Sequence, residues 1–206
     1  MSRSTALLVL LVLALPTAAL AQKGRPTPTP PGPPGTVCID FEPPLVLGTR
    51  YGRPVGQSPG DLAFISQNVR VTVETFRQVS AGSAFEYAQI VNPPRPFASG
   101  QSLRSNNIGL QFDFRNLGFT PRRVTVQFLD LGGYENLAVN GNPVPTYAGE
   151  LAAAPTPIAG VAVAVTTTPL LPPISGKTGT LELTGPVTTL RIGGQELWID
   201  NVCAVP

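Results

Sequence analysis

The sequence predicts an all-β protein, an antiparallel two-sheet β-sandwich of jelly-roll type with about ten short strands. Apolar and polar residues alternate with the period of a strand in several separate stretches. The 24 prolines and 21 glycines place turn signals between most of these stretches. No stretch has a convincing amphipathic helical pattern, and Pro155 and Pro157 limit residues 148–154 to one helical turn.

Residues 1–21 have the features of a secretory signal peptide. Arg3 precedes an apolar stretch at 6–15, and Ala19-Leu20-Ala21 fits the small-x-small cleavage rule. The alternative is a retained N-terminal anchor, for which the apolar run is short. We therefore predict cleavage before Gln22 and a secreted protein, extracellular or periplasmic, with no membrane span in the mature chain.

Residues 22–36 form a Pro/Thr-rich linker or disordered arm, because proline removes backbone donors and favours an extended conformation. This arm is interpreted as either a spacer or a passive tail. Residues 37–206 are long enough for one β-sandwich domain with its own core. Arg3 is the only charged residue of the signal peptide, so the net charge falls from +2 to +1. A nearly neutral chain without a basic cluster argues against nucleic-acid binding.

The strands are expected where alternation or β-branched runs are bounded by glycine, proline or asparagine. The expected ranges are 37–42, 69–76, 85–91, 107–114, 123–131, 137–139, 158–165, 180–183, 187–192 and 196–205. Residues 48–60 are expected to be a loop. Asn140-Gly141 and Gly185-Pro186 predict hairpins. The apolar run at 158–165 is either an inner strand buried on both faces or a strand that completes a neighbour's sheet.

The two ends of the predicted domain contain the only two cysteines. In an exported chain they predict a disulfide between Cys38 and Cys203, with unpaired thiols or an intermolecular bridge as the alternative. If the two residues face each other in antiparallel strands, Asp40 opposes Asn201. Strict alternation then places Asp200 on the other face from Asp40. Either a β-bulge shifts the register or the cysteines are not directly opposed.

The closing phrase Leu197-Trp198-Ile199-Asp200-Asn201-Val202 resembles the last strand of secreted jelly-roll modules, the galactose-binding-like and carbohydrate-binding β-sandwiches. The acidic opening strand, with Asp40 and Glu42, resembles theirs as well. The resemblance is limited to these first and last strands. It implies that the terminal strands are neighbours and that a structural calcium ion lies beside them.

Four residues of these strands offer the hard oxygen ligands that calcium prefers: Asp40, Glu42, Asp200 and Asn201. We therefore predict a structural calcium site if the two ends meet. The alternative is that the carboxylates are edge-strand charges, or ion-pair partners of Arg50 or Arg191.

The residue types limit the chemistry that the chain can perform. It has no histidine, which removes Ser-His-Asp and Cys-His catalysis and any histidine-based metal site. No phosphate-binding or dinucleotide-binding motif is present. Nothing marks a pair of acid and base carboxylates, so we predict no catalytic residues and no enzyme.

Sugar binding requires exposed aromatic rings, and two tyrosines lie in glycine-rich stretches. Tyr51 and Tyr134 are therefore candidate ligand-binding residues, with ordinary packing as the alternative. Trp198 is expected to pack within the sheets.

Three functional hypotheses follow. The first is a non-catalytic exported β-sandwich that binds glycan or cell-surface material, together with a structural calcium ion. The second is a structural subunit of an extracellular matrix, envelope or filament that self-associates through β-strand contacts. The third is a small glycan hydrolase, which no feature of the sequence supports.

Overall fold

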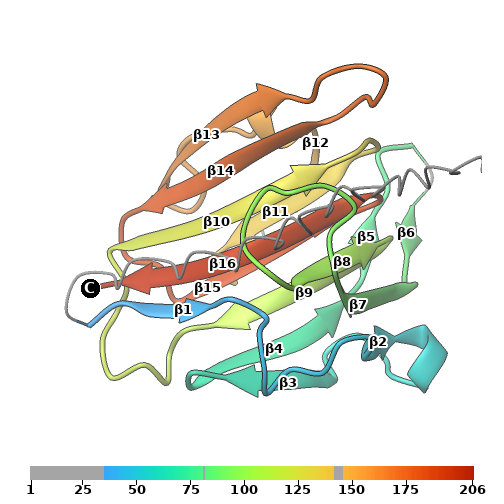
Figure 1. The fold of residues 1–206 in the computed structure, drawn as a ribbon. Coiled ribbons are helices and arrows are strands. Elements are labelled where there is room, and N and C mark those ends of the chain that lie inside the picture. Colours follow the sequence, from blue (N-terminus) through green and yellow to red (C-terminus); the bar gives the residue numbers. More distant parts are fainter. Residues whose placement is uncertain (1–34, 81, 142–145) are drawn as a thin grey trace, which may run out of the picture.

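A computed structural model of the chain describes residues 35–80, 82–141 and 146–206. The predicted signal peptide, and the predicted arm up to residue 34, lie outside the described residues. The regular secondary structure of the described chain is almost entirely β-strand, with two antiparallel sheets stacked face to face (Figure 1). This confirms the predicted all-β sandwich, while the jelly-roll connectivity stays a prediction.

The larger sheet has eight strands, and the two ends of the domain meet in it. Along the sheet they are β13 (Ala162–Pro169), β14 (Lys177–Thr184), β10 (Arg123–Asp130), β16 (Leu197–Val205), β8 (Ser102–Asn106), β7 (Tyr87–Val91) and β2 (Arg50–Gly52), with β1 (Val37–Ile39) also paired to β16. Because β10 occupies one edge of β16, β8 and β1 follow one another along its other edge.

The smaller sheet has six strands, and two short 3-10 helices and a two-stranded ribbon complete the fold. The sheet contains β12 (Tyr147–Gly149), β11 (Glu135–Val139), β15 (Thr189–Gly194), β9 (Ile108–Asp113), β4 (Val69–Glu74) and β3 (Leu62–Ser66). The ribbon is β5 (Phe76–Arg77) with β6 (Ser83–Ala84), and the helices are η1 (Arg53–Val55) and η2 (Leu151–Ala153). Among the described residues, no helix has the length and apolarity to cross a membrane.

The core lies between the two sheets and is made by the alternating residues of both. In β10 the inward residues are Val124, Val126 and Phe128, and in β9 they include Leu110 and Phe112. All five are fully buried. The period-2 patterns of the sequence therefore mark the core faces correctly, because each strand buries one face and exposes the other.

Most predicted strands are present, with shifted ends, but several elements differ from the prediction. The predicted loop at 48–60 contains β2 and η1, and β3, β6, β8 and β12 had no prediction. The single helical turn is confirmed as η2. Asn140 and Gly141 both adopt positive φ, as their turn requires. However, β12 begins only at Tyr147, so the predicted two-residue hairpin is wrong.

Two predictions about strand neighbours are wrong. The Gly185-Pro186 turn does not join a hairpin, because β14 pairs with β10 and β13 whereas β15 pairs with β9 and β11 in the other sheet. The run at 158–165 is not an inner strand: β13 forms an edge of the larger sheet (Figure 1). A local pattern predicts a strand, but the choice of its neighbours depends on packing between sheets.

Candidate functional sites

The predicted disulfide is present, and the structure decides between the two registers that the sequence left open. Cys38 and Cys203 are bonded, and they face each other in the antiparallel pair of β1 and β16. The flanking pairs are Val37 with Ala204 and Ile39 with Val202. The terminal strands are therefore neighbours, and the bridge closes a loop across 165 positions.

A β-bulge in β16 resolves the conflict over the face of Asp200. Thr125 of β10 opposes Cys203, but Gln127 opposes Asp200, so two residues of β16 lie against one residue of β10. Asn201, at this bulge, has a φ of 47°. Ile199 and Val202 both enter the core. Asp200 therefore shares the outer face with Cys203 and with exposed Asp40.

The predicted calcium ligands contact different partners. The Asp40 carboxylate accepts a hydrogen bond from the backbone N–H of Glu42, at 3.2 Å. The Glu42 carboxylate accepts one from the N–H of Gln101, at 2.6 Å, and Asp200 accepts one from the N–H of Asn201, at 2.7 Å. The Asn201 side chain donates to Gln127, at 2.8 Å. We call Asp40, Glu42 and Asp200 the terminal acidic group.

The terminal acidic group does not converge on one point. In the described part of the chain, one trio of side chains brings its carboxylate oxygens within 4.8 Å of one another, and it contains none of these residues. The calcium ion beside the terminal strands stays a prediction. The alternative ion pairs are not formed either: Arg191 lies 4.0 Å from Glu74, and the Arg50 guanidinium lies over the ring of Tyr87.

Burial gives Asp200 an unusual pKa. Loss of solvent, together with the negative charges of Asp40 and Glu42, raises the pKa of the Asp200 carboxyl to about 8, against the hydrogen bond from Asn201. The side chain is only 1% exposed. The folded protein therefore holds Asp200 protonated at neutral pH.

The predicted ligand-binding tyrosines lie in different environments. Tyr51 belongs to β2, is buried, and packs its ring 5.3 Å from that of Phe64. Its ring is therefore not exposed for stacking on a ligand. Tyr134 is 44% exposed in the connection between β10 and β11. Trp198 is buried under the guanidinium of Arg104, 5.2 Å from its ring, as expected for sheet packing.

A second acidic group, absent from the predicted sites, lies at one end of the sandwich. Asp130 ends β10, Glu135 begins β11 and Glu150 follows β12, and their carboxylate oxygens lie within 4.8 Å of one another. Lys177, the first residue of β14, has its ammonium 3.1 Å from Asp130 and also contacts Glu150. We call these four residues the sandwich-end cluster.

Two carboxylates of the cluster are held by backbone donors. Asp130 Oδ1 accepts from the N–H of Gly132, at 2.8 Å, and Glu135 Oε2 accepts from the N–H of Leu151, at 3.1 Å. The other oxygen of Glu135, Oε1, is buried and has no hydrogen-bond partner among the described residues. Glu135 as a whole is 0% exposed. A buried carboxylate oxygen without a partner is costly, so this atom needs a proton or a cation.

The electrostatics of the cluster follow from this burial. Desolvation, together with the charge of Asp130, raises the pKa of Glu135 to about 8. Desolvation alone would lower the pKa of Lys177, but hydrogen bonds to Glu150 and Asp130 outweigh it and raise that pKa. Lys177 therefore stays charged and balances part of the negative charge.

The sequence holds one signal for this cluster. Asp130 and Glu135 flank Gly132-Gly133, and this short connection carries the chain from one sheet to the other. Acidic residues at both ends of a crossing between sheets indicate a shared site. Glu150 and Lys177 come from separate segments, and no local pattern predicts that they join.

A groove lies on the outer face of the larger sheet. One cavity, of about 460 Å³, is lined by the β13–β14 turn and by Arg95 and Pro96. A second, of about 200 Å³, is lined by Phe97 and by polar residues of β10, β13 and β14. The two share Thr168 and Thr178, so they form one depression.

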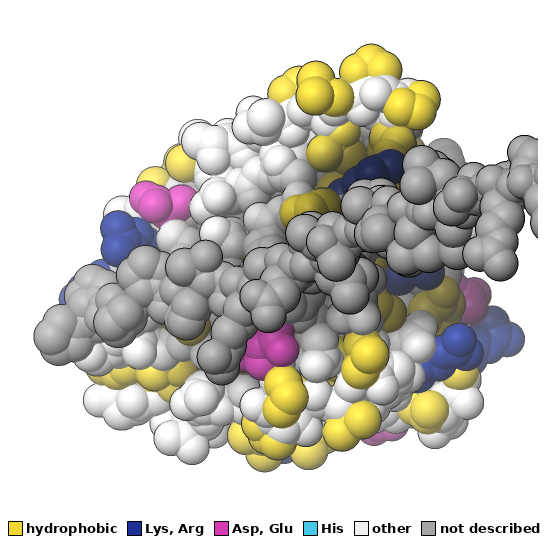
Figure 2. Space-filling view, in the orientation of Figure 1, with side chains coloured by type: hydrophobic (Ala, Val, Ile, Leu, Met, Phe, Trp, Pro, Cys, Tyr) yellow, Lys and Arg dark blue, Asp and Glu magenta, His cyan; other side chains and the backbone are white. Residues whose placement is uncertain are grey.

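The floor of this depression is built by cross-strand rows of polar side chains. One row runs Thr166, Thr180 and Gln127, and the next runs Thr168 and Thr178. Alternation places them outside, because Val126, Val163 and Leu181 face the core. We call this surface, with Arg95, Pro96 and Phe97, the threonine groove. Figure 2 shows hydrophobic side chains gathered over the β13–β14 turn and a mostly uncharged surface along both strands.

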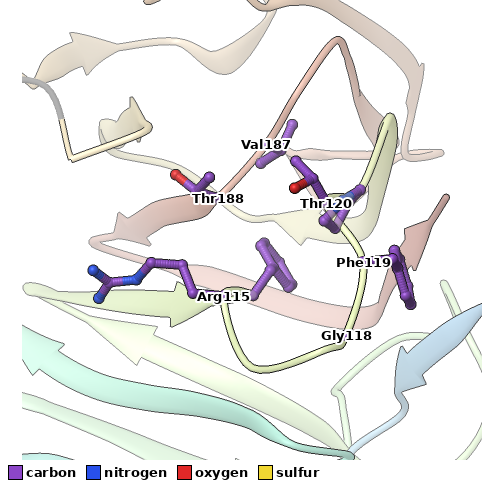
Figure 3. Close-up of a pocket in the computed structure, with 8 residues that line it drawn as sticks. Arg115, Gly118, Phe119, Thr120, Val187 and Thr188 are labelled. Atoms are coloured by element: carbon purple, nitrogen blue, oxygen red, sulfur yellow. The ribbon is translucent and has the colours of Figure 1, made fainter.

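A further cavity, of about 260 Å³, lies between the β9–β10 and β14–β15 connections (Figure 3). Arg115 lines it, but its guanidinium is bound to Asp113, at 2.8 Å, and the side chain extends away from Thr120 and Val187. The remaining polar lining consists of two threonines. This cavity offers few groups that would orient a ligand.

Comparison of the chain with protein-family models, curated proteins and solved structures found no match.

Proposed function

We propose that the protein is a non-catalytic exported β-sandwich that binds a glycan or another cell-surface polymer in the threonine groove. The groove itself carries this proposal, because polar side chains of three neighbouring strands line one depression on one sheet face. The disulfide supports export, since such bonds persist in oxidising compartments.

The chemistry of the groove suits a neutral sugar chain. Threonine hydroxyls and the Gln127 amide both donate and accept hydrogen bonds, as sugar hydroxyls do. Phe97 and Pro96 add an apolar wall against which a sugar ring can lie. The described residues that line the groove include no carboxylate, which supports binding over hydrolysis by an acid and base pair.

The test is binding of the purified protein to a glycan array, with and without chelator. We expect at least ten-fold weaker binding when Thr178 and Thr180 are both changed to Val, because the shape is kept and two hydroxyls are lost. Phe97→Ala should weaken binding similarly. The matched control is Thr167→Val, since Thr167 is exposed on β13 but points to the opposite face.

Two results would overturn the proposal. One is silence of the unmodified protein on every glycan. The other is loss of binding in Tyr134→Ala with full binding in the groove variants, which would move the site to the β10–β11 connection, where Tyr134 remains a predicted ligand residue.

The second candidate function is a structural subunit that self-associates through β-strand contacts, and the edge position of β13 favours it. β13 pairs with β14 on one side, and its other side has no strand partner among the described residues. Thr156 contacts this free edge only near the start of β13, where its hydroxyl accepts a hydrogen bond from the N–H of Val163, at 2.9 Å. An unprotected edge can pair with another chain.

Sedimentation at increasing concentration tests this second function. Self-association that is abolished by Ala162→Lys with Ala164→Lys would support it, because lysine on an edge strand blocks pairing. A strict monomer at all concentrations would contradict it. The same variants should leave glycan binding intact, so the two functions are separable.

A further inference from the structure

We propose that the sandwich-end cluster is a binding site for a divalent cation, Ca²⁺ in particular, which takes the place that the Lys177 ammonium holds in the structure. The proposal does not depend on the threonine groove. It rests on two separate observations: three carboxylates with oxygens within 4.8 Å of one another, and the unpartnered, fully buried Oε1 of Glu135.

The ligand oxygens are positioned before any cation binds. The N–H of Gly132 holds one oxygen of Asp130, and the N–H of Leu151 holds one oxygen of Glu135. The second oxygen of Asp130 contacts the Lys177 ammonium, and the second oxygen of Glu135 has no hydrogen-bond partner among the described residues. Fixed ligands lose little conformational freedom on binding, which favours affinity.

The charges of the cluster also favour a divalent cation. One ammonium faces three carboxyl groups, and a divalent cation would favour the ionised form of all three, including Glu135, whose proton it would displace. Lys177 contacts Asp130 and Glu150 but has no hydrogen bond to Glu135. Its ammonium therefore does not bind all three carboxyl groups of the cluster. Its side chain is 22% exposed on a flexible stem, and Glu150 is 51% exposed, so both can move when an ion enters.

The donor set selects among metals. All three ligands are carboxylates, which suit hard cations and not the softer metals that prefer sulfur or imidazole. Ca²⁺ accepts six to eight oxygens in irregular arrangements, whereas Mg²⁺ demands a near-ideal octahedron. Ligands from three separate segments at the end of a sandwich fit the tolerant ion better.

The experiment is calorimetric titration of CaCl₂ into purified, EDTA-treated protein, with thermal unfolding followed in parallel. We expect binding and a rise in the melting temperature, because the ion binds only the folded state. Glu135→Gln should weaken calcium binding at least ten-fold, since Gln still accepts from the Leu151 N–H but has no second carboxylate oxygen. Lys177→Met should bind calcium more tightly than the unmodified protein, since a competing cation is removed.

Asp61→Asn is the matched control, because Asp61 also accepts from a backbone N–H, that of Ser58, but lies outside both acidic groups; its calcium affinity should be unchanged, and Glu42→Gln tests the terminal strands separately. Terbium luminescence gives a second measurement if Lys177→Met does not fold. Tyr147 donates to the backbone oxygen of Glu150, at 2.7 Å, so its ring should sensitise a bound Tb³⁺. Tyr147→Phe should dim that signal without loss of calcium affinity.

Three results would overturn the proposal: no heat or melting shift with calcium in the unmodified protein, unchanged affinity in Glu135→Gln, or loss of affinity in Glu42→Gln alone. The last would return calcium to the terminal strands. A larger melting shift with Mg²⁺ than with Ca²⁺ would overturn the choice of ion.

Discussion

The terminal acidic group and the sandwich-end cluster each contain three carboxylates, yet only the second directs them to one point. Asp40 and Glu42 follow β1, whereas Asp200 lies in the neighbouring β16, and each accepts a hydrogen bond from a different backbone N–H. In the sandwich-end cluster, the carboxylates lie at the end of β10, at the start of β11 and just after β12. Their oxygens come close together, and Lys177 contacts two of them.

The difference shows that adjacency in a sheet is not the same as convergence. Side chains on one sheet face stand roughly parallel, so neighbouring carboxylates remain separate. At the end of a sandwich, by contrast, strands of both sheets and their connections can point to one volume. Asp130 and Glu135 do so because the chain crosses between the sheets there.

The largest expected effect concerns the disulfide. It joins β1 to β16 beside the terminal acidic group and does not touch the sandwich-end cluster. Replacing Cys38 and Cys203 with Ser should lower the free energy of unfolding by up to about 5 kcal/mol, because a loop of this length gains much entropy when released. Urea unfolding, followed by fluorescence of the single tryptophan, measures it. Folded variant protein should still bind calcium at the other end. A loss below about 1 kcal/mol would contradict the entropy argument.

The next effect is the pH dependence that Asp200 introduces. Its folded pKa of about 8 exceeds the ordinary value near 3.9, so the folded state keeps a proton that the unfolded state loses. This destabilises the fold increasingly as pH rises from about 4 to 8, and the cost is absent below pH 4. Asp200→Asn removes the cost and keeps the acceptor for the Asn201 N–H.

Asp200→Asn should therefore raise the free energy of unfolding at pH 7 by at most about 4 kcal/mol and leave it unchanged below pH 4. Denaturant unfolding of both proteins across this pH range checks the expectation. Asp61→Asn is the control, because Asp61 is exposed and lies outside the terminal acidic group, so it should change stability little. An equal gain at all pH values would argue against a protonated Asp200.

A smaller effect is expected at the bulge that places Asp200 on the outer face. Asn201→Val should cost on the order of 1–3 kcal/mol, since a β-branched residue is strained at a φ of 47°. Asn201→Gly accepts this φ and should cost less, losing mainly the hydrogen bond to Gln127. Urea unfolding of both variants measures the difference. Equal costs would show that the side-chain hydrogen bond matters more than the backbone.

The smallest effect on stability is expected for Glu150→Gln in EDTA. The pair of Glu150 and Lys177 is half exposed, and such pairs contribute less than about 1 kcal/mol. With calcium present, the same variant should lose most of the melting shift shown by the unmodified protein. Thermal unfolding in both conditions measures the contrast. A large loss in EDTA would mean that Lys177 is the permanent cation of this cluster.

Several features of the fold could be predicted from local patterns. The strands at 107–114 and 123–131, the Cys38–Cys203 bridge and the one-turn helix before Pro155 are all confirmed. Each depends on alternation, on residue type or on a helix breaker. The tyrosines show the limit: Tyr51 and Tyr134 both follow glycine-rich signals, yet one is buried against Phe64 and the other is exposed.

The sequence by itself determined that this chain is an all-β protein whose two ends are tied together, because the strand period and the cysteine pair are readable without knowing any contact. Only the tertiary structure decided which carboxylates meet. A bulge at Asn201 turned Asp200 to the outer face, and the crossing between sheets joined Asp130 to Glu135. Convergence depends on how two sheets stack, and segments far apart in the chain carry no local trace of it.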